Sequence, residues 1–134
     1  MKKIVMTFGT FDGIHPGHES LLKQAKSLGD ELVVALAQDT TVQRLKADLP
    51  QYKFRERQMM LEDSGLVDLV IPADKKLGSY KSVKRIKPET IALGYDQTEL
   101  RKDLEQWIKE NKEPIQLVTL SAFKPEQFKT SLLK

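Results

Sequence analysis

The chain has 134 residues, of which 40% are hydrophobic and 31% charged, so it is long enough for one domain with its own core. It contains no cysteine, which excludes disulfide bonds, thiolate metal sites and a cysteine nucleophile. The net charge of +3 is the small difference between 22 basic and 19 acidic residues spread along the chain, a pattern atypical of nucleic-acid-binding proteins.

Strand-like and helix-like apolar patterns alternate along the whole chain. In chain order they predict a strand over 4–8, a helix over 17–28, a strand over 31–37, a helix over 51–64, a strand over 68–72, a helix over 81–86, a strand over 89–93, a helix over 98–111, a strand over 114–120 and a helix over 126–133. This alternation predicts a single α/β domain over 1–134, a doubly wound, Rossmann-like, five-stranded parallel sheet with helices on both faces.

Two further stretches overlap these predicted helices. Residues 39–52 are interpreted as a mobile stretch, and whether they close as a lid stays open. The densest basic stretch, residues 75–87, is interpreted as the solvated face of a surface helix.

The sequence also bears on location. No apolar run approaches the roughly 20 residues that span a bilayer. The apolar run after Lys2 and Lys3 is too short for a signal-peptide core. We therefore expect a cytoplasmic protein with no membrane or nucleic-acid partner.

Ligands of doubly wound folds bind at the carboxyl ends of the strands, near the point where the strand order reverses. This rule nominates the loops after Phe8, Ala37, Leu93 and Leu120. The first of these loops holds the most distinctive segment of the chain, residues 9–18 with the sequence GTFDGIHPGH.

Each residue type in this segment suits a turn that binds phosphate. Glycines permit close backbone approach, and Pro16 fits a first helical turn, where its missing N–H is not needed. Gly17 leaves room for an anion, and we expect free backbone N–H groups of the helix start to point toward it. His15 and His18 can donate hydrogen bonds to phosphate oxygens that gain charge during the reaction.

Other interpretations of the segment are weaker. Either histidine alone would more often be an ordinary polar side chain or a helix cap. A zinc site needs further ligands, and these are the only two histidines, so no protein metal site is predicted. The segment also lacks the Gly-Lys-Ser/Thr ending of a Walker P-loop and the glycine spacing of a dinucleotide fingerprint.

The segment resembles the signature of the cytidylyltransferase-like nucleotidyltransferase superfamily, a His-x-Gly-His motif after a Gly-Thr-Phe-Asp turn. The similarity extends to residues 25–34 (AKSLGDELVV), to 67–72 (VDLVIP), to 93–97 (LGYDQ), and to the order of Asp39, Lys46 and Arg57, so it covers essentially the whole chain. It implies transfer of a nucleoside monophosphate from a nucleoside triphosphate to a phosphorylated acceptor, with release of pyrophosphate.

The resemblance also implies roles by position. It implies four catalytic residues: His15, His18, Lys46 and Arg57. It implies nucleotide-binding roles for Gly9, Thr10, Phe11, Asp12, Gly17, Gly94, Tyr95, Asp96, Lys129, Thr130 and Ser131. Mg²⁺ is expected to arrive with the triphosphate rather than in a protein cage.

Plainer roles stay open for several of these residues. Asp12 could be a helix-entry cap, Lys46 a solvated lysine and Asp96 a turn former. The two hydroxyls near the C-terminus could be ordinary N-caps, and Arg55 is the register alternative to Arg57.

Members of this superfamily differ in the acceptor that they use. The segment after the fifth predicted strand lacks the arginine and Glu-Gly pair of glycerol-3-phosphate cytidylyltransferases, which use CTP. It is more similar to archaeal-type FAD synthases, with an aromatic-lysine pair at Phe123 and Lys124 and an aromatic residue before paired hydroxyls. This resemblance implies ATP and FMN rather than CTP and glycerol 3-phosphate. A nucleotide-binding module without activity is the remaining alternative, and the superfamily suggests a homodimer.

Overall fold

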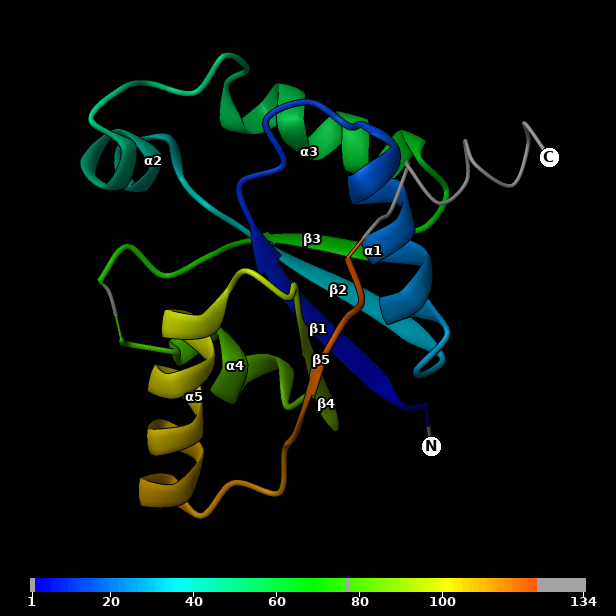
Figure 1. Ribbon diagram of the computed structural model, residues 1–134, viewed down its shortest axis with the longest axis vertical. Helices are drawn as coiled ribbons and strands as arrows, with labels where there is room; N and C mark the ends of the chain where they lie inside the picture. Colours follow the sequence, from blue (N-terminus) through cyan, green and yellow to red (C-terminus); the bar gives the residue numbers. More distant parts are fainter. Residues whose placement is uncertain (1, 77, 123–134) are drawn as a thin grey trace, which may run out of the picture.

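The computed structural model describes residues 2–76 and 78–122, which form one parallel sheet with helices on both faces (Figure 1). In chain order the elements are β1 (Ile4–Gly9), α1 (Pro16–Lys26), β2 (Glu31–Leu36), α2 (Asp39–Lys46), α3 (Phe54–Asp63), β3 (Leu69–Pro72), α4 (Lys81–Ile86), β4 (Thr90–Leu93), α5 (Thr98–Asn111) and β5 (Gln116–Thr119). The predicted doubly wound α/β fold is confirmed.

The sheet has the strand order β3-β2-β1-β4-β5, and every neighbouring pair is parallel. The chain thus leaves β1 toward β2 and β3, and returns to the other side of β1 with β4. The order reverses between β1 and β4, which is where a ligand is expected in such a sheet.

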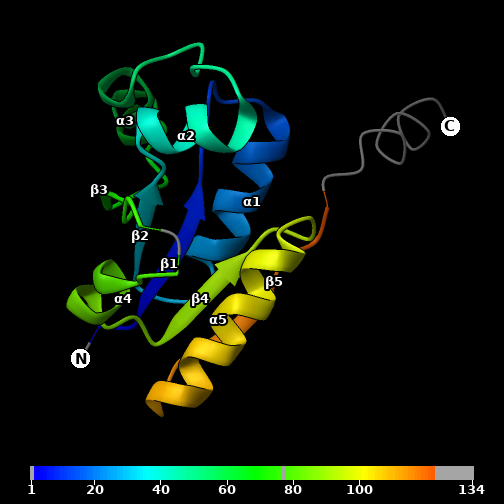
Figure 2. The same cartoon turned by 90° about the vertical axis from the view of Figure 1, so that its left-hand side faces the viewer.

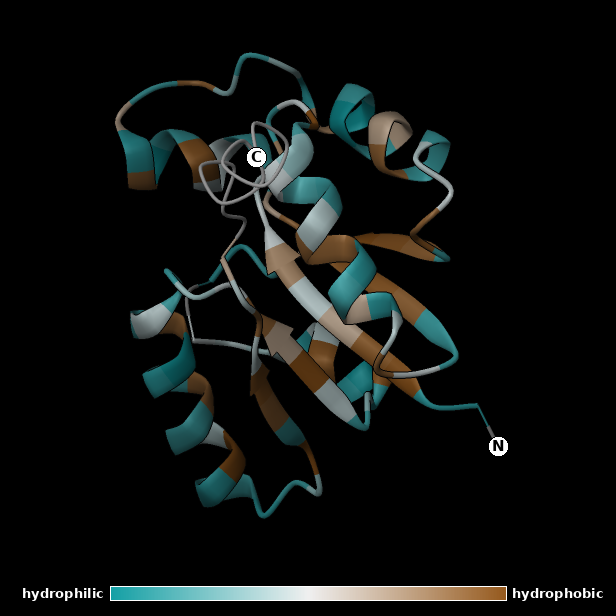
Figure 3. Ribbon diagram, turned by 45° about the vertical axis from the view of Figure 1, so that its right-hand side comes forward, coloured by the Kyte–Doolittle hydropathy of each residue, from teal (hydrophilic) through white to brown (hydrophobic). Residues whose placement is uncertain are grey.

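Successive side chains of a strand point to opposite faces of the sheet, which explains the two helical layers. Val5 packs with α1 and α3 on one face, whereas the next residue, Met6, packs with α4 and α5 on the other. Val34 and Val33 of β2 divide in the same way. Both faces of the central strands are therefore apolar, as Figure 3 shows by their colour, and helices cover both.

Helix α2 was missed by the sequence prediction, which treated residues 39–52 as a mobile stretch. Two threonines and a valine give this short segment a low helix propensity. Tertiary contacts override it, because Thr41 and Val42 are buried. The helix ends at Ala47, which has a left-handed backbone with φ of 59°. It lies beyond the carboxyl ends of β1 and β2 (Figure 2).

Two other boundaries differ from the prediction. The predicted helix over 51–64 begins only at Phe54, because Gln51 and Tyr52 use their N–H groups to bind Asp12. The basic stretch 75–87 is not one helix, since α4 covers only Lys81–Ile86. The predicted helix over 126–133 lies outside the described residues. None of the helices in the described ranges is long and apolar enough to cross a membrane.

Candidate active site

A cleft of about 910 Å³ opens at the carboxyl edge of the sheet, where β1 and β4 separate. Paired residues of these two strands reach only to Met6 and Ile91, whereas β1 and β2 stay paired as far as Gly9 and Leu36. The lining comes from the loops after β1, β4 and β5, from the start of α1 and from the end of α2: Phe8, Gly9, Thr10, Phe11, Asp12, His15, Pro16, Gly17, His18, Leu21, Lys46, Gly94, Tyr95, Asp96, Gln97, Ser121 and Ala122.

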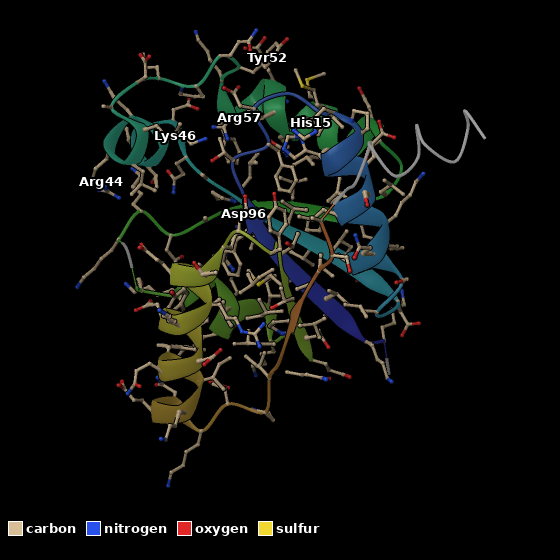
Figure 4. The ribbon with its side chains drawn as sticks, viewed as in Figure 1. His15, Arg44, Lys46, Tyr52, Arg57 and Asp96 are labelled. Atoms are coloured by element: carbon tan, nitrogen blue, oxygen red, sulfur yellow. The ribbon has the colours of Figure 1, made fainter. Side chains whose placement is uncertain are left out.

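The cleft brings together most of the predicted site. Three of the four nominated loops, those after β1, β4 and β5, line it directly. The loop after β2 contributes through Lys46, at the far end of α2. Figure 4 shows His15 above the end of β1, Lys46 on α2 and Asp96 beyond β4. The predicted residues Lys129, Thr130 and Ser131 lie outside the described residues.

His15 is the N-cap of α1. Its Nδ1 accepts hydrogen bonds from the backbone N–H groups of Gly17, at 3.1 Å, and His18, at 3.3 Å. A nitrogen that accepts a hydrogen bond carries no proton, so the neutral ring has its proton on Nε2. The bonding at the helix start thus fixes the tautomer and puts the ring proton on Nε2, where it can be donated to a ligand.

The same bonds correct one prediction. We expected the first backbone N–H groups of this helix to be free for an anion, but those of Gly17 and His18 are used by the His15 ring. A helix cap was an alternative role for Asp12 and for either histidine, and the structure gives that role to His15. In place of these two amide groups, the helix start offers a phosphate the imidazole groups of His15 and His18.

His18 lies under His15 and against the core. The two rings are stacked, with centroids 3.6 Å apart, and the Phe11 ring lies 5.2 Å from that of His18. Burial lowers the pKa of His18 below its usual value, the charges of His15 and Lys46 lower it further, and the Gly13 backbone only partly offsets them. The ring is therefore held neutral near pH 7, as a donor without a charge of its own.

Phe11 supports this arrangement from inside the protein. Its backbone is left-handed, with φ of 47°, and its side chain is buried in the core on the α1 side. Gly9 makes this possible, because a Cβ there would lie 2.6 Å from the Phe11 ring. Both residues line the cleft, yet the turn needs them first for its shape.

Arg57 supports the turn after β1 from inside the protein. Its guanidinium is fully buried and donates to the Thr10 carbonyl at 2.8 Å, the Tyr52 carbonyl at 2.9 Å and the Asp39 carboxylate at 2.6 Å. It is absent from the described residues that line the cleft. Arg55, the register alternative, is exposed. The structure thus gives Arg57 a supporting position, while direct contact with substrate stays a prediction.

Asp12 makes a second link to the same region. Its two carboxylate oxygens accept from Gln51 N–H at 2.7 Å and Tyr52 N–H at 2.8 Å. Partial burial raises the pKa of Asp12, but these bonds and the charges of Arg57 and Lys46 outweigh it, so the pKa lies below its usual value. Asp12 therefore orients the loop, one of its predicted roles.

Lys46 is exposed at the C-terminal end of α2 and reaches the cleft. Arg44 of the same helix points away from it in Figure 4 and donates to the Lys75 carbonyl at 2.6 Å. Lys46 is thus the cation of α2 that is placed to meet an anionic ligand.

The segment after β4 closes the cleft from the other side. Tyr95 is 60% exposed, and Asp96 lies beside it. Gln97 was missed as a site residue. Its Nε2 donates to the Phe8 carbonyl at 3.0 Å and its Oε1 accepts from Gly94 N–H at 2.8 Å. One side chain thereby spans the split between β1 and β4, a role for which the sequence carries no periodic signal.

The donors of the cleft suit Mg²⁺ only together with a nucleotide. Over the described ranges, no group of three or more His, Cys, Asp or Glu residues could hold a metal ion. Asp12, one of the two carboxylates of the cleft, already binds two backbone N–H groups. Phosphate oxygens would have to supply most ligands of such an ion, with Asp96 as the carboxylate at hand.

Comparison with known proteins of similar sequence and structure identifies the family. The cytidylyltransferase-like family profile matches residues 6–134. A protein of Aciduliprofundum boonei named FAD synthase is 39% identical over 119 residues, 89% of this chain and 78% of that one. A Thermococcus sibiricus protein of the same name is 39% identical over 132 residues, 97% of this chain and 89% of that one. The crystal structure of a lipopolysaccharide core biosynthesis protein from Thermoplasma volcanium GSS1 superposes with a TM-score of 0.84 at 33% identity, covering 92% of this chain and 100% of that one. The chain belongs to the cytidylyltransferase-like family.

Proposed function

We propose that this protein is an FMN adenylyltransferase, an FAD synthase that joins ATP and FMN and releases pyrophosphate. A phosphate oxygen of FMN would attack the α-phosphorus of ATP. The bond from that phosphorus to the oxygen bridging to the β-phosphate breaks, and pyrophosphate leaves with the electron pair. The observation that carries the proposal is the stacked pair His15 and His18, which faces the same cleft as Lys46.

Electrostatic stabilisation is the chemistry that these side chains can perform. Charge develops on the phosphate oxygens as the bond to pyrophosphate breaks, and preformed donors stabilise it most effectively. His15 offers its Nε2–H group, His18 is held neutral beside it, and Lys46 adds a positive charge. Mg²⁺, bound with the triphosphate, would neutralise part of its negative charge.

The acceptor is inferred from two further features. Relatives that match most of this chain are named FAD synthase. Tyr95 presents an exposed aromatic ring at the cleft, and both adenine and the flavin have flat rings that can stack on such a surface. The lining also contains Phe8 and Leu21, which favour a partly apolar ligand.

The test is pyrophosphate release from ATP and from CTP, each with FMN and with glycerol 3-phosphate. We expect product only with ATP and FMN, and a His18→Ala variant should lower kcat at least tenfold. Product only from CTP and glycerol 3-phosphate would replace FMN adenylylation with the cytidylyltransferase alternative. Tight nucleotide binding without turnover of any pair would identify a binding module. The cytoplasmic location and the homodimer stay predictions, and light scattering of the purified protein tests the second.

A further inference from the structure

The chain leaves the sheet directly beside the cleft. Leu120 still donates to the Leu93 carbonyl at 2.7 Å, as a strand residue would, and its side chain is buried. Ser121 follows and lines the cleft together with Ala122. Ser121 is therefore the residue at which the path of the chain must be fixed by something other than strand pairing.

The side chain of Gln24, on α1, binds the backbone of Ser121. The Oε1 of Gln24 accepts from Ser121 N–H at 2.9 Å, and its Nε2 donates to the Ser121 carbonyl at 3.1 Å. The same Nε2 lies 3.2 Å from the Oγ of Ser20, one turn earlier on the helix. One carboxamide thus satisfies both backbone groups of Ser121, as the backbone of a neighbouring strand would.

We propose that Gln24 is a positioning residue of the transfer reaction, which holds Ser121 and Ala122 at the edge of the cleft. Gln24 is not one of the described residues that line the cleft, so it acts through Ser121. Its role in catalysis rests on the proposed function, whereas its contact with Ser121 does not.

Two substitutions of Gln24 test its hydrogen bonds to Ser121. Glutamate has nearly the shape of glutamine, but it places a second acceptor, with negative charge, against the Ser121 carbonyl. Methionine has a similar length but lacks both the amide oxygen and the amide N–H groups of glutamine. All three residues are good helix formers, so α1 itself should be unaffected by either change.

The experiment compares Gln24→Met and Gln24→Glu with wild type in steady-state kinetics with ATP and FMN. We expect each variant to lower kcat/KM at least fivefold, since the loss of even one net hydrogen bond is worth roughly a factor of five. Gln24→Met should also speed hydrogen exchange at the Ser121 amide at least fivefold, while the melting temperature stays near that of wild type. The matched control is Gln106→Met on α5, which loses only a pairing with Glu110 at 2.6 Å and should match wild type throughout.

Three results would overturn the proposal. The first is wild-type kinetics in both Gln24 variants, and the second is an equal loss in Gln106→Met. The third is lower activity in Gln24→Met with wild-type exchange at the Ser121 amide, because the loss would then not act through the contact with Ser121.

A failure of the proposed function can be told apart from a failure of this inference. If wild type forms no FAD, the affinity for ATP and the Ser121 amide exchange still report on Gln24. Faster exchange with at least fivefold weaker ATP binding in Gln24→Met would support the positioning role, and unchanged ATP binding would overturn it.

Discussion

A single imidazole at the helix start has two separable tasks. The Nδ1 of His15 caps α1, and its Nε2–H group is left for the ligand. Histidine is a weak choice for a cap, because asparagine, aspartate, serine and threonine serve better. The helix alone therefore does not require histidine at this position, whereas the proposed reaction needs a donor such as its Nε2–H group.

Replacing His15 by asparagine should separate the two tasks. The asparagine oxygen can accept the N–H groups of Gly17 and His18, so the free energy of unfolding should stay within about 0.5 kcal/mol of wild type. The donor to the phosphate is lost, so kcat should fall at least tenfold. Urea unfolding and steady-state kinetics measure the two effects.

His15→Ala is the control, because it removes both the cap and the donor. It should lose activity to the same extent and also destabilise the fold by about 1 kcal/mol. Near-normal turnover of His15→Asn would remove His15 from the reaction and leave it as a helix cap.

The elements around the cleft are joined by one buried side chain. Arg57 of α3 binds the turn after β1 through Thr10, the segment before α3 through Tyr52, and the start of α2 through Asp39. Helix α2 carries Lys46 at its other end. The position of the lysine relative to the two histidines therefore depends on this link.

Arg57→Met should cost about 3 kcal/mol of unfolding free energy, because it leaves two carbonyls and a carboxylate without their donor. It should also raise KM for the nucleotide, because α2 and the turn lose their common anchor. Arg55→Met, an exposed neighbour on the same helix, is the matched control and should change neither quantity. Equal stability of the two variants would contradict the role of Arg57 as a buried link.

The difference between these two arginines marks the limit of what the sequence predicts. Apolar periodicity predicts the five strands, and residues 9–18 predict the cleft, because both are local patterns. The burial of Arg57, the bridge made by Gln97 and the helical state of α2 depend on residues brought together by the fold. Lys46 lines the cleft, as expected for a residue of the predicted site, yet the helix that carries it was not foreseen.

At the scale of the whole molecule, a few titratable groups join segments far apart in the chain. Asp12 binds the backbone at Gln51 and Tyr52. Asp68 pairs with Lys26 of α1 and accepts from Leu32 N–H of β2 at 2.7 Å. His18 stacks on His15 and packs against Phe11. Each of these contacts needs one protonation state, so the stability of the fold depends on pH.

The free energy of unfolding should fall in two stages as the pH is lowered from about 7.5. The first comes below the ordinary pKa of 6.5, because burial beside His15 and Lys46 lowers the pKa of folded His18, so the unfolded chain binds that proton more readily. The second stage comes below the ordinary aspartate pKa of 3.8. The contacts with Lys26 and Leu32 lower the pKa of folded Asp68. Hydrogen bonds from the backbone lower the pKa of Asp12, although burial opposes them. Urea unfolding across this range measures both stages.

Two variants assign the stages to their residues. His18→Asn should flatten the first stage and Asp68→Asn should shrink the second. A free energy of unfolding that increases as the pH is lowered from about 7 to 5 would contradict the neutral state of His18.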